Sequence, residues 1–198
     1  MSVPMVFTVD GMLEHFIAEG GDVSAEDLRI ALGRVGRNAG PALLAKLSDA
    51  NLLELTVLAM FVGDVWNAAE YPDGCLDAWE WDSLFRIAGY TVDGEPAEQP
   101  VGTLTLYRGS APATKANWSW TDNLATAVGF AMGTGARRRR DGTVWQAAVE
   151  PWRLYARNHG PDGRSGHEYV VDTEGLDILE YVPSRDQVLG YRTPTPEE

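Results

Sequence analysis

Apolar residues recur at helical spacing through the first half of the chain and predict a helical region. Ser24 and Asp27 resemble a capping box ahead of a helix that Gly36 ends. Pro41 lies in the first turn of a second helix, and Ser48 is expected to cap a long third one. The helices predicted on this basis cover about 25–35, 42–47, 48–70 and 76–88.

The two longer apolar segments of this region have the composition of a protein core. The helix over 48–70 is apolar on most of its sides, which indicates a buried central helix. The helix over 76–88 carries Trp79, Trp81 and Phe85. Core packing explains these aromatic residues better than a ligand-binding box does.

The pattern changes period after residue 100. A polar connector over 91–100, with an Asp-Gly pair and two prolines, is typical of a loop or linker. Beyond it, short β-rich runs alternate with turn residues, and one helix over about 123–132 interrupts them with Thr121 or Asp122 as its cap. The β-rich runs cover 101–108, 143–149, 152–157, 167–172 and 176–182. We therefore predict an α+β protein, with a helical region over 1–95 and a β-rich domain over 100–190.

Charge is distributed unevenly along the 198 residues, whose formal net charge is −13. Residues 1–100 contain 5 Lys/Arg and 17 Asp/Glu, whereas residues 101–198 contain 11 and 12. The acidity of the first half indicates good solubility and leaves open a docking surface for a basic partner. It argues against nonspecific nucleic-acid binding, because a negative surface repels the phosphate backbone.

The amino terminus lacks a basic segment followed by a long apolar one, so we expect no signal peptide. The most apolar stretch, 55–62, is far shorter than the roughly 20 residues that cross a bilayer. The single cysteine, Cys75, excludes an internal disulfide and fits a reducing compartment. These features predict a soluble cytoplasmic protein that does not bind membranes.

The first candidate for chemistry is the strand ending Leu104-Thr-Leu-Tyr-Arg-Gly109. Leu104, Leu106 and Arg108 share one face of this strand, which directs the Arg108 side chain inward. A half-buried guanidinium needs an anionic partner, which is either a bound phosphate or a carboxylate of the protein itself. Gly109 lets the chain turn away and leaves room for a ligand.

Two further segments carry polar side chains at strand ends. In Trp118-Ser-Trp-Thr121, Ser119 and Thr121 share one face and the two tryptophans the other, although Thr121 also suits a purely capping role. Glu168 shares a face with Val170 and follows a loop rich in turn formers. A carboxylate among apolar neighbours beside such a loop is a reasonable active-site candidate.

In this order and setting the three segments resemble the mono-ADP-ribosyltransferase family of the Arg–Ser–Glu type. That signature has an aromatic–Arg pair at a strand end, a Ser-x-Ser/Thr strand running into a helix, and a later Glu on another strand. It corresponds here to Tyr107-Arg108, Ser119-Trp120-Thr121 and Glu168, within residues 101–182. The resemblance implies a split mixed β-sheet core. The arrangement with a helical first half also looks like uncharacterised proteins of actinobacteria and their phages, which implies a bacterial or phage-infected cell as the setting.

The resemblance implies that NAD is the substrate and that ADP-ribose passes to a macromolecular acceptor, for which a protein is expected. Glu168 would stabilise the positive charge that develops on the ribose, Arg108 would hold the dinucleotide, and Ser119 would position Glu168. No metal is needed. The residues expected to contact NAD are Tyr107, Arg108, Gly109, Ser119, Trp120 and Thr121.

One position departs from the family pattern. Arginine-modifying relatives carry Glu or Gln two residues before the catalytic Glu, and this chain has Gly166 there. Arginine is therefore disfavoured as the acceptor. Two alternatives stay open: an NAD glycohydrolase that uses water, and a non-catalytic binding protein on a transferase-like fold whose acidic helical half recognises a partner.

The remaining motifs give weaker indications of function. Gly133-Thr-Gly135 with the arginines at 137–140 follows a helix, whereas phosphate-cradling loops lie between a strand and a helix, so a solvated loop is expected. His15, His159 and His167 are too scattered in sequence to indicate a metal site, and strand alternation gives His167 a structural role on the face opposite Glu168.

Overall fold

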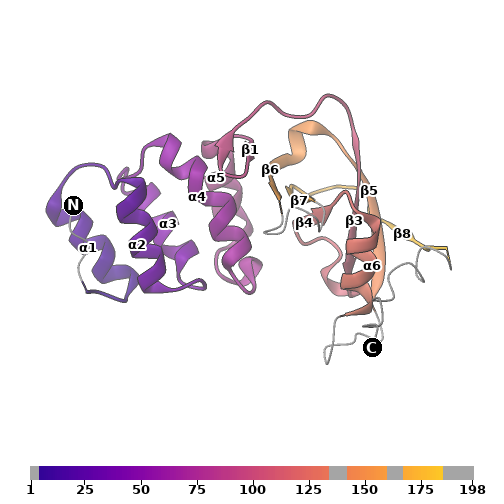
Figure 1. Cartoon of the computed structure of the whole chain (residues 1–198), viewed down its shortest axis with the longest axis horizontal. Coiled ribbons are helices and arrows are strands. Elements are labelled where there is room, and N and C mark those ends of the chain that lie inside the picture. The colour runs from indigo at the N-terminus through magenta and orange to yellow at the C-terminus, as the bar shows by residue number, and fades with distance from the viewer. Residues whose placement is uncertain (1–4, 134–141, 160–166, 185–198) are drawn as a thin grey trace, which may run out of the picture. The chain divides into compact units, whose positions relative to one another are not determined.

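The computed structural model describes residues 5–133, 142–159 and 167–184, and the chain divides into two compact units, 1–98 and 99–198 (Figure 1). The described residues form six α-helices and eight strands, which confirms the α+β class. The segments over 137–140 and Gly166, both singled out in the sequence, lie outside the described residues.

The first unit is built from helices that mostly follow the predicted segments. Their bounds are α1 (Val9–Glu19), α2 (Ala25–Val35), α3 (Gly40–Asp49), α4 (Leu55–Ala68) and α5 (Ala78–Ala88). The prediction for α2 is confirmed, including its cap, where Ser24 Oγ accepts the Asp27 N–H at 3.2 Å. The sequence pattern did not predict α1.

The predicted start of the long helix was wrong. Ser48 lies inside α3 and does not cap α4, which begins after Glu54. The break between the helices falls at Asn51, whose φ of 52° is a left-handed conformation that a continuing α-helix does not contain. The predicted helix over 48–70 is thus the end of one helix, a turn and a second helix.

The core of the first unit confirms the packing interpretation for Trp81 and Phe85, but the interpretation was wrong for Trp79. The Trp66 and Trp81 rings meet edge to face at 5.0 Å, and the Trp81 ring stacks on Phe85 at 5.8 Å. All three side chains are buried, and α4 contributes most of its length to the same core. Trp79, on the same helix as Trp81, is instead exposed.

The expected polar linker is a β-hairpin of the first unit. Strands β1 (Thr91–Val92) and β2 (Glu95–Pro96) pair antiparallel around Asp93 and Gly94, both of which have positive φ. An Asp-Gly turn of this kind matches the right-handed twist of a hairpin. A Cβ on Gly94 would lie 2.5 Å from the Met60 carbonyl oxygen, so the turn packs directly on α4.

The second unit contains a β-sheet and one helix. The strands are β3 (Leu104–Ser110), β4 (Ser119–Thr121), β5 (Thr143–Val149), β6 (Leu154–His159), β7 (His167–Val171) and β8 (Leu179–Tyr181). Within this unit their order is β6-β7-β4-β3-β5-β8, with antiparallel neighbours. Strand β6 starts later than predicted because Pro151–Arg153 form a 3-10 turn.

Helix α6 (Leu124–Met132) packs against β3 and β5, as Figure 1 shows. Its cap is Asn123, whose Oδ1 accepts the Ala125 N–H at 2.9 Å, so the predicted cap at Thr121 or Asp122 was wrong. The small side chains Ala127, Val128 and Ala131 form a buried cluster with Val144 of β5. No helix in the described part of the chain is long and apolar enough to span a bilayer.

Candidate active site

Three neighbouring strands of the second unit carry the predicted catalytic residues. The register pairs Thr121 of β4 with Glu168 of β7 and Ser119 with Val170. Residues directly opposite each other in a sheet share a face, so Ser119 and Glu168 lie diagonally on one face. Strand β4 is thus the link between β7 and β3, which carries Arg108.

The carboxyl group of Glu168 is largely buried. Burial raises its pKa, because the ionised form loses solvation. The Ser119 side chain donates a hydrogen bond to the carboxyl, and the positive charge of Arg108 acts on it; both lower the pKa, by less than burial raises it. Sequence reasoning assigned Ser119 to position Glu168, and this contact is the one that assignment requires.

Main-chain carbonyl groups hold the guanidinium of Arg108 beside the site. Its Nε donates to the Thr114 carbonyl oxygen at 3.0 Å and its Nη1 to the Ser119 carbonyl oxygen at 2.6 Å. The residue of β3 that pairs with Thr121 is Tyr107, so strand alternation alone does not put Arg108 on the face of Glu168. The positive charge of Arg108 acts on the Glu168 carboxyl, and the carbonyl oxygens of Thr114 and Ser119 hold the guanidinium.

Two residues predicted to contact NAD instead build the strand framework. A Cβ on Gly109 would overlap the Ala127 carbonyl oxygen and lie 2.5 Å from Ala131 N, so the space at this glycine is filled by α6 and not left for a ligand. Tyr107 packs beside the same helix and against Tyr181, with ring centroids 5.5 Å apart.

The β4 residues Trp120 and Thr121 were also predicted to contact NAD. Trp120 is 2% exposed, and its indole N–H donates to the Asn117 carbonyl oxygen, so its ring belongs to the core and is closed to stacking. Thr121 is buried, and its hydroxyl accepts the Asn123 N–H at 3.1 Å at the entry to α6. Of the predicted set, the structure brings Arg108 and Ser119 to Glu168, and Thr121 lies directly opposite Glu168 in the sheet.

Asp122 ties the start of β7 to the end of β4. Its Oδ2 lies 2.6 Å from His167 Nδ1, and its Oδ1 accepts the His167 main-chain N–H at 3.2 Å. The Tyr169 hydroxyl donates to the same Oδ2 at 3.3 Å. The structural role predicted for His167 thus has a named partner, and these contacts align the strand on which Glu168 lies.

Sequence reasoning missed Asn158, which lies directly opposite Glu168 on β6. Asn158 is 5% exposed, and within the described part of the protein neither its Oδ1 nor its Nδ2 has a hydrogen-bond partner. Its position in a turn-rich segment gave no signal, because only the register between β6 and β7 brings it to Glu168.

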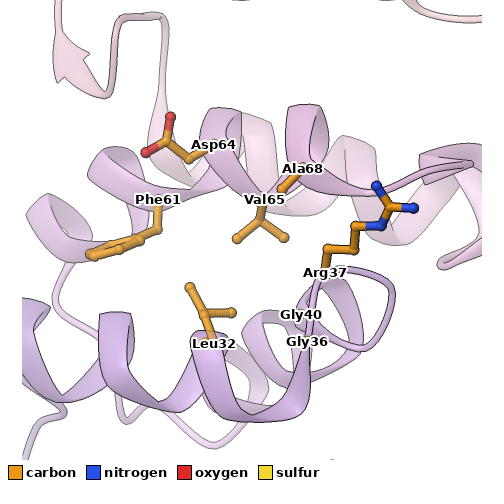
Figure 2. Close-up of a pocket in the computed structure, with 9 residues that line it drawn as sticks. Leu32, Gly36, Arg37, Gly40, Phe61, Asp64, Val65 and Ala68 are labelled. Atoms are coloured by element: carbon orange, nitrogen blue, oxygen red, sulfur yellow. The ribbon is translucent and has the colours of Figure 1, made fainter. Parts of the chain in front are cut away.

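A separate cavity of about 290 Å³ lies within the first unit, lined by α2, α4 and the turn between α2 and α3. Figure 2 shows Leu32 and Val65 pointing into it from opposite sides, with Phe61 at one end and Arg37 at the other. Arg37 is paired with Glu70 at 2.8 Å. The lining is therefore mostly apolar, with its basic end already neutralised.

Asp64 gives this cavity an acidic rim. Burial raises the pKa of Asp64, the nearby Asp93 raises it further, and Arg29 opposes the shift. Like charge at Asp64 and Asp93 disfavours a bound phosphate and favours a cation. The cavity does not suit the diphosphate of NAD.

Comparisons of the chain with protein-family models, with curated proteins and with solved structures found no match. Among the described residues, no group of three or more His, Cys, Asp or Glu side chains is arranged to hold a metal ion. The geometry around Glu168 is therefore the main indication of function.

Proposed function

We propose that the protein is an NAD-dependent mono-ADP-ribosyltransferase whose second unit has an ADP-ribosyltransferase-like fold. The observation that supports this most is the convergence on one buried carboxyl. Glu168 accepts a hydrogen bond from Ser119 and lies within reach of the charge of Arg108, on three neighbouring strands. These are the residue types, in the same order, that the family signature requires.

The proposed reaction breaks the bond between C1′ of the ribose and the nitrogen of nicotinamide. The bonding electron pair leaves with nicotinamide, which becomes neutral, and positive charge develops on the sugar ring. A nucleophilic atom of the acceptor then bonds to C1′ and loses its proton. The difficult point is the charge on the ribose, and a fixed carboxylate is suited to stabilise it.

In this proposal Glu168 is ionised when it acts, and it stabilises the ribose charge through a hydrogen bond to an adjacent ribose hydroxyl. A partly dry environment strengthens that interaction, since water no longer screens the carboxylate. Ser119 holds the carboxylate, and Arg108 holds the carbonyl group of Ser119. The result is a connected series of contacts from β3 through β4 to β7, in which Arg108 also offers positive charge to NAD phosphate.

We further propose that the acidic first unit recruits a basic protein acceptor. Residues 1–98 carry 17 Asp/Glu and 5 Lys/Arg, and Asp64 places an acidic group at the rim of an apolar cavity. A Lys or Arg next to an aliphatic side chain is the complement of such a surface. Recruitment at this site is separable from NAD cleavage, because the cavity and the Glu168 site lie in different units.

The test is nicotinamide release from NAD by the full chain, with and without cell lysate as a source of acceptor. Glu168→Gln keeps the shape of the side chain and removes its charge, so release should fall by about 100-fold or more. Glu180→Gln is the matched control, because Glu180 is an exposed carboxylate on β8 of the same unit. Its activity should equal that of the wild type.

Protein labelling in the same assay separates the possible acceptors. Nicotinamide release with labelled protein supports the transferase. Release without labelling at any lysate concentration would identify a glycohydrolase that uses water. Equal release by the wild type and Glu168→Gln, or none in either condition, would contradict NAD chemistry at this site and favour a binding protein.

A further inference from the structure

Asn158 is a buried polar residue whose amide has no hydrogen-bond partner among the described residues. It is 5% exposed, and both polar atoms of its amide lack a hydrogen-bond partner within the described residues. Each buried polar group left unpaired costs about 1–3 kcal/mol. Such a group in a native core calls for a compensating role.

The position of Asn158 indicates what that role is. The register of β6 and β7 places Asn158 opposite Glu168, and that of β4 and β7 places Thr121 opposite Glu168 on its other side. Directly opposed residues in an antiparallel pair have Cβ atoms about 4.5–5.5 Å apart. The amide of Asn158 and the carboxyl of Glu168 are therefore neighbours on one face of the sheet.

The two groups are chemically complementary once Glu168 is ionised. A carboxylate only accepts hydrogen bonds and has about four lone-pair positions, whereas an Asn amide offers two N–H donors. Ser119 supplies one donor to the carboxyl, and the guanidinium of Arg108 is directed at the carbonyl groups of Thr114 and Ser119. A second donor beside Ser119 would hold the buried charge and fix its direction.

We propose that Asn158 is a positioning residue for Glu168, with its Nδ2–H groups donating to the ionised carboxylate in the working enzyme. The pairing depends only on the geometry of β6 and β7. Its effect on turnover rests on the proposed function, in which Glu168 is the catalytic carboxylate. Asn158 acts through Glu168 and does not contact the reacting atoms.

Two ionisable side chains lie near Glu168, and each is directed at another hydrogen-bond partner. Arg108, from β3, is the charged side chain that acts on the carboxyl. His167, the preceding residue on β7, alternates to the opposite face and is held by Asp122. The guanidinium of Arg108 donates to the carbonyl oxygens of Thr114 and Ser119, and the imidazole of His167 lies against Asp122.

The experiment replaces the amide by an apolar group of nearly the same shape, Asn158→Leu, in the full chain. Because the substitution removes two buried unpaired polar atoms, its urea midpoint should equal or exceed that of the wild type. The NMR titration of the Glu168 carboxyl, assigned with Glu168→Gln, should move to higher pH by roughly half a unit or more. The kcat of nicotinamide release should fall about tenfold or more, with less change in KM for NAD.

Two companion variants complete the test. Asn158→Asp keeps the shape, removes the donors and adds a like charge, so the Glu168 titration should move further in the same direction than in Asn158→Leu. Thr91→Val is the control, because it removes a buried hydroxyl in the first unit that likewise has no hydrogen-bond partner among the described residues. It should raise the urea midpoint and leave the Glu168 titration and turnover unchanged.

The measurements distinguish a failure of the proposed function from a failure of the pairing between Asn158 and Glu168. If the wild type releases no nicotinamide but the Glu168 titration still moves in Asn158→Leu, the proposed function is wrong and the pairing stands. An unchanged titration with a lower urea midpoint would overturn the pairing and make Asn158 a structural residue. An unchanged titration with a higher KM would also overturn it, because Asn158 would then contact NAD directly.

Discussion

The tight packing of α6 against Gly109 in the second unit supports a prediction of large effect. In Gly109→Ala the new Cβ would overlap the Ala127 carbonyl oxygen, lie 2.5 Å from Ala131 N and 2.9 Å from the Ala127 carbonyl carbon. These are main-chain atoms of α6, so no rotamer change can make room. Helix α6 must move away from β3.

The size of the effect follows from that movement. Restoring a contact of about 3.5 Å to Ala131 N requires a shift of roughly 1 Å, and a gap of that size removes a quarter to a half of the dispersion energy of each lining contact. The buried cluster of Ala127, Val128 and Val144 would lose packing along with it. Overpacking usually costs about 1–3 kcal/mol, and because main-chain atoms cannot yield, we expect about 3 kcal/mol or more. At an m value of about 1–3 kcal/mol/M, the urea midpoint falls by about 1–3 M.

The assay must resolve the two units, because they need not unfold together. Hydrogen exchange with mass spectrometry on peptides from β3 and α6 reports the second unit alone. Gly33→Ala is the matched control, because a Cβ at this helical position of α2 has no atom within 4 Å. It should stabilise the first unit by about 0.5–1 kcal/mol.

One result would refute the reasoning about Gly109. If Gly109→Ala keeps the wild-type urea midpoint and the exchange protection of α6, the packing argument is wrong. Loss of NAD turnover in such a well-folded variant would restore the interpretation drawn from the sequence, in which Gly109 leaves room for a ligand. Loss of stability in the second unit supports the packing role.

Two predictions concern charge. Because burial raises the folded pKa of Glu168, this residue favours folding at low pH, and that contribution is lost as the pH rises from the unfolded value of about 4.3 through the raised folded value. Glu168→Gln should therefore gain stability over the wild type with rising pH, by about 1.4 kcal/mol per unit of pKa elevation, measured by urea unfolding. A difference that stays constant with pH would contradict a raised pKa of Glu168. Asp64→Lys should reduce protein labelling severalfold and leave nicotinamide release unchanged. Asp49→Lys on α3 makes the same change of charge away from the cavity and is the control. Equal labelling by both variants would contradict specific recruitment by the cavity rim.

Local signals explain why several helices were predictable. The cap at Ser24 and the helix end at Gly36 depend on residues within one turn of the chain, and both are where the sequence puts them. Helix α1 was not predicted because its apolar residues do not all lie on one buried face: Met12 and Phe16 are buried, but Ile17 is exposed. A glycine in its first turn, Gly11, weakens the helical signal further.

The hairpin of β1 and β2 shows a different limit. The Asp-Gly pair was correctly interpreted as a turn, but strands of two residues are too short to show alternation. The two strands pair with each other, and their turn packs at Gly94 against the Met60 carbonyl group of α4. A contact across such a distance in sequence leaves no pattern in the local residues.

In the candidate site, too, the features set within one strand were predictable and those set between strands were not. Alternation within a strand was enough to predict that Ser119 faces away from the tryptophans and that Glu168 shares a face with Val170, and the register agrees. Alternation says nothing about which residue of a neighbouring strand lies opposite. The pairs of Asn158 with Glu168 and of Asp122 with His167 depend on that register, so the sequence alone did not reveal them.

The energetics of the site connect these pairs to function. An ionised carboxylate at Glu168 and an unpaired amide at Asn158 both oppose folding, and the hydrogen bond from Ser119 and the charge of Arg108 offset only part of the cost at Glu168. The neighbouring Asp122–His167 contacts are well satisfied and hold β7 against β4. Next to these satisfied contacts, the amide of Asn158 has no hydrogen-bond partner among the described residues, and a ligand or the ionised Glu168 could supply one. This contrast supports our proposal that NAD acts at the face around Glu168.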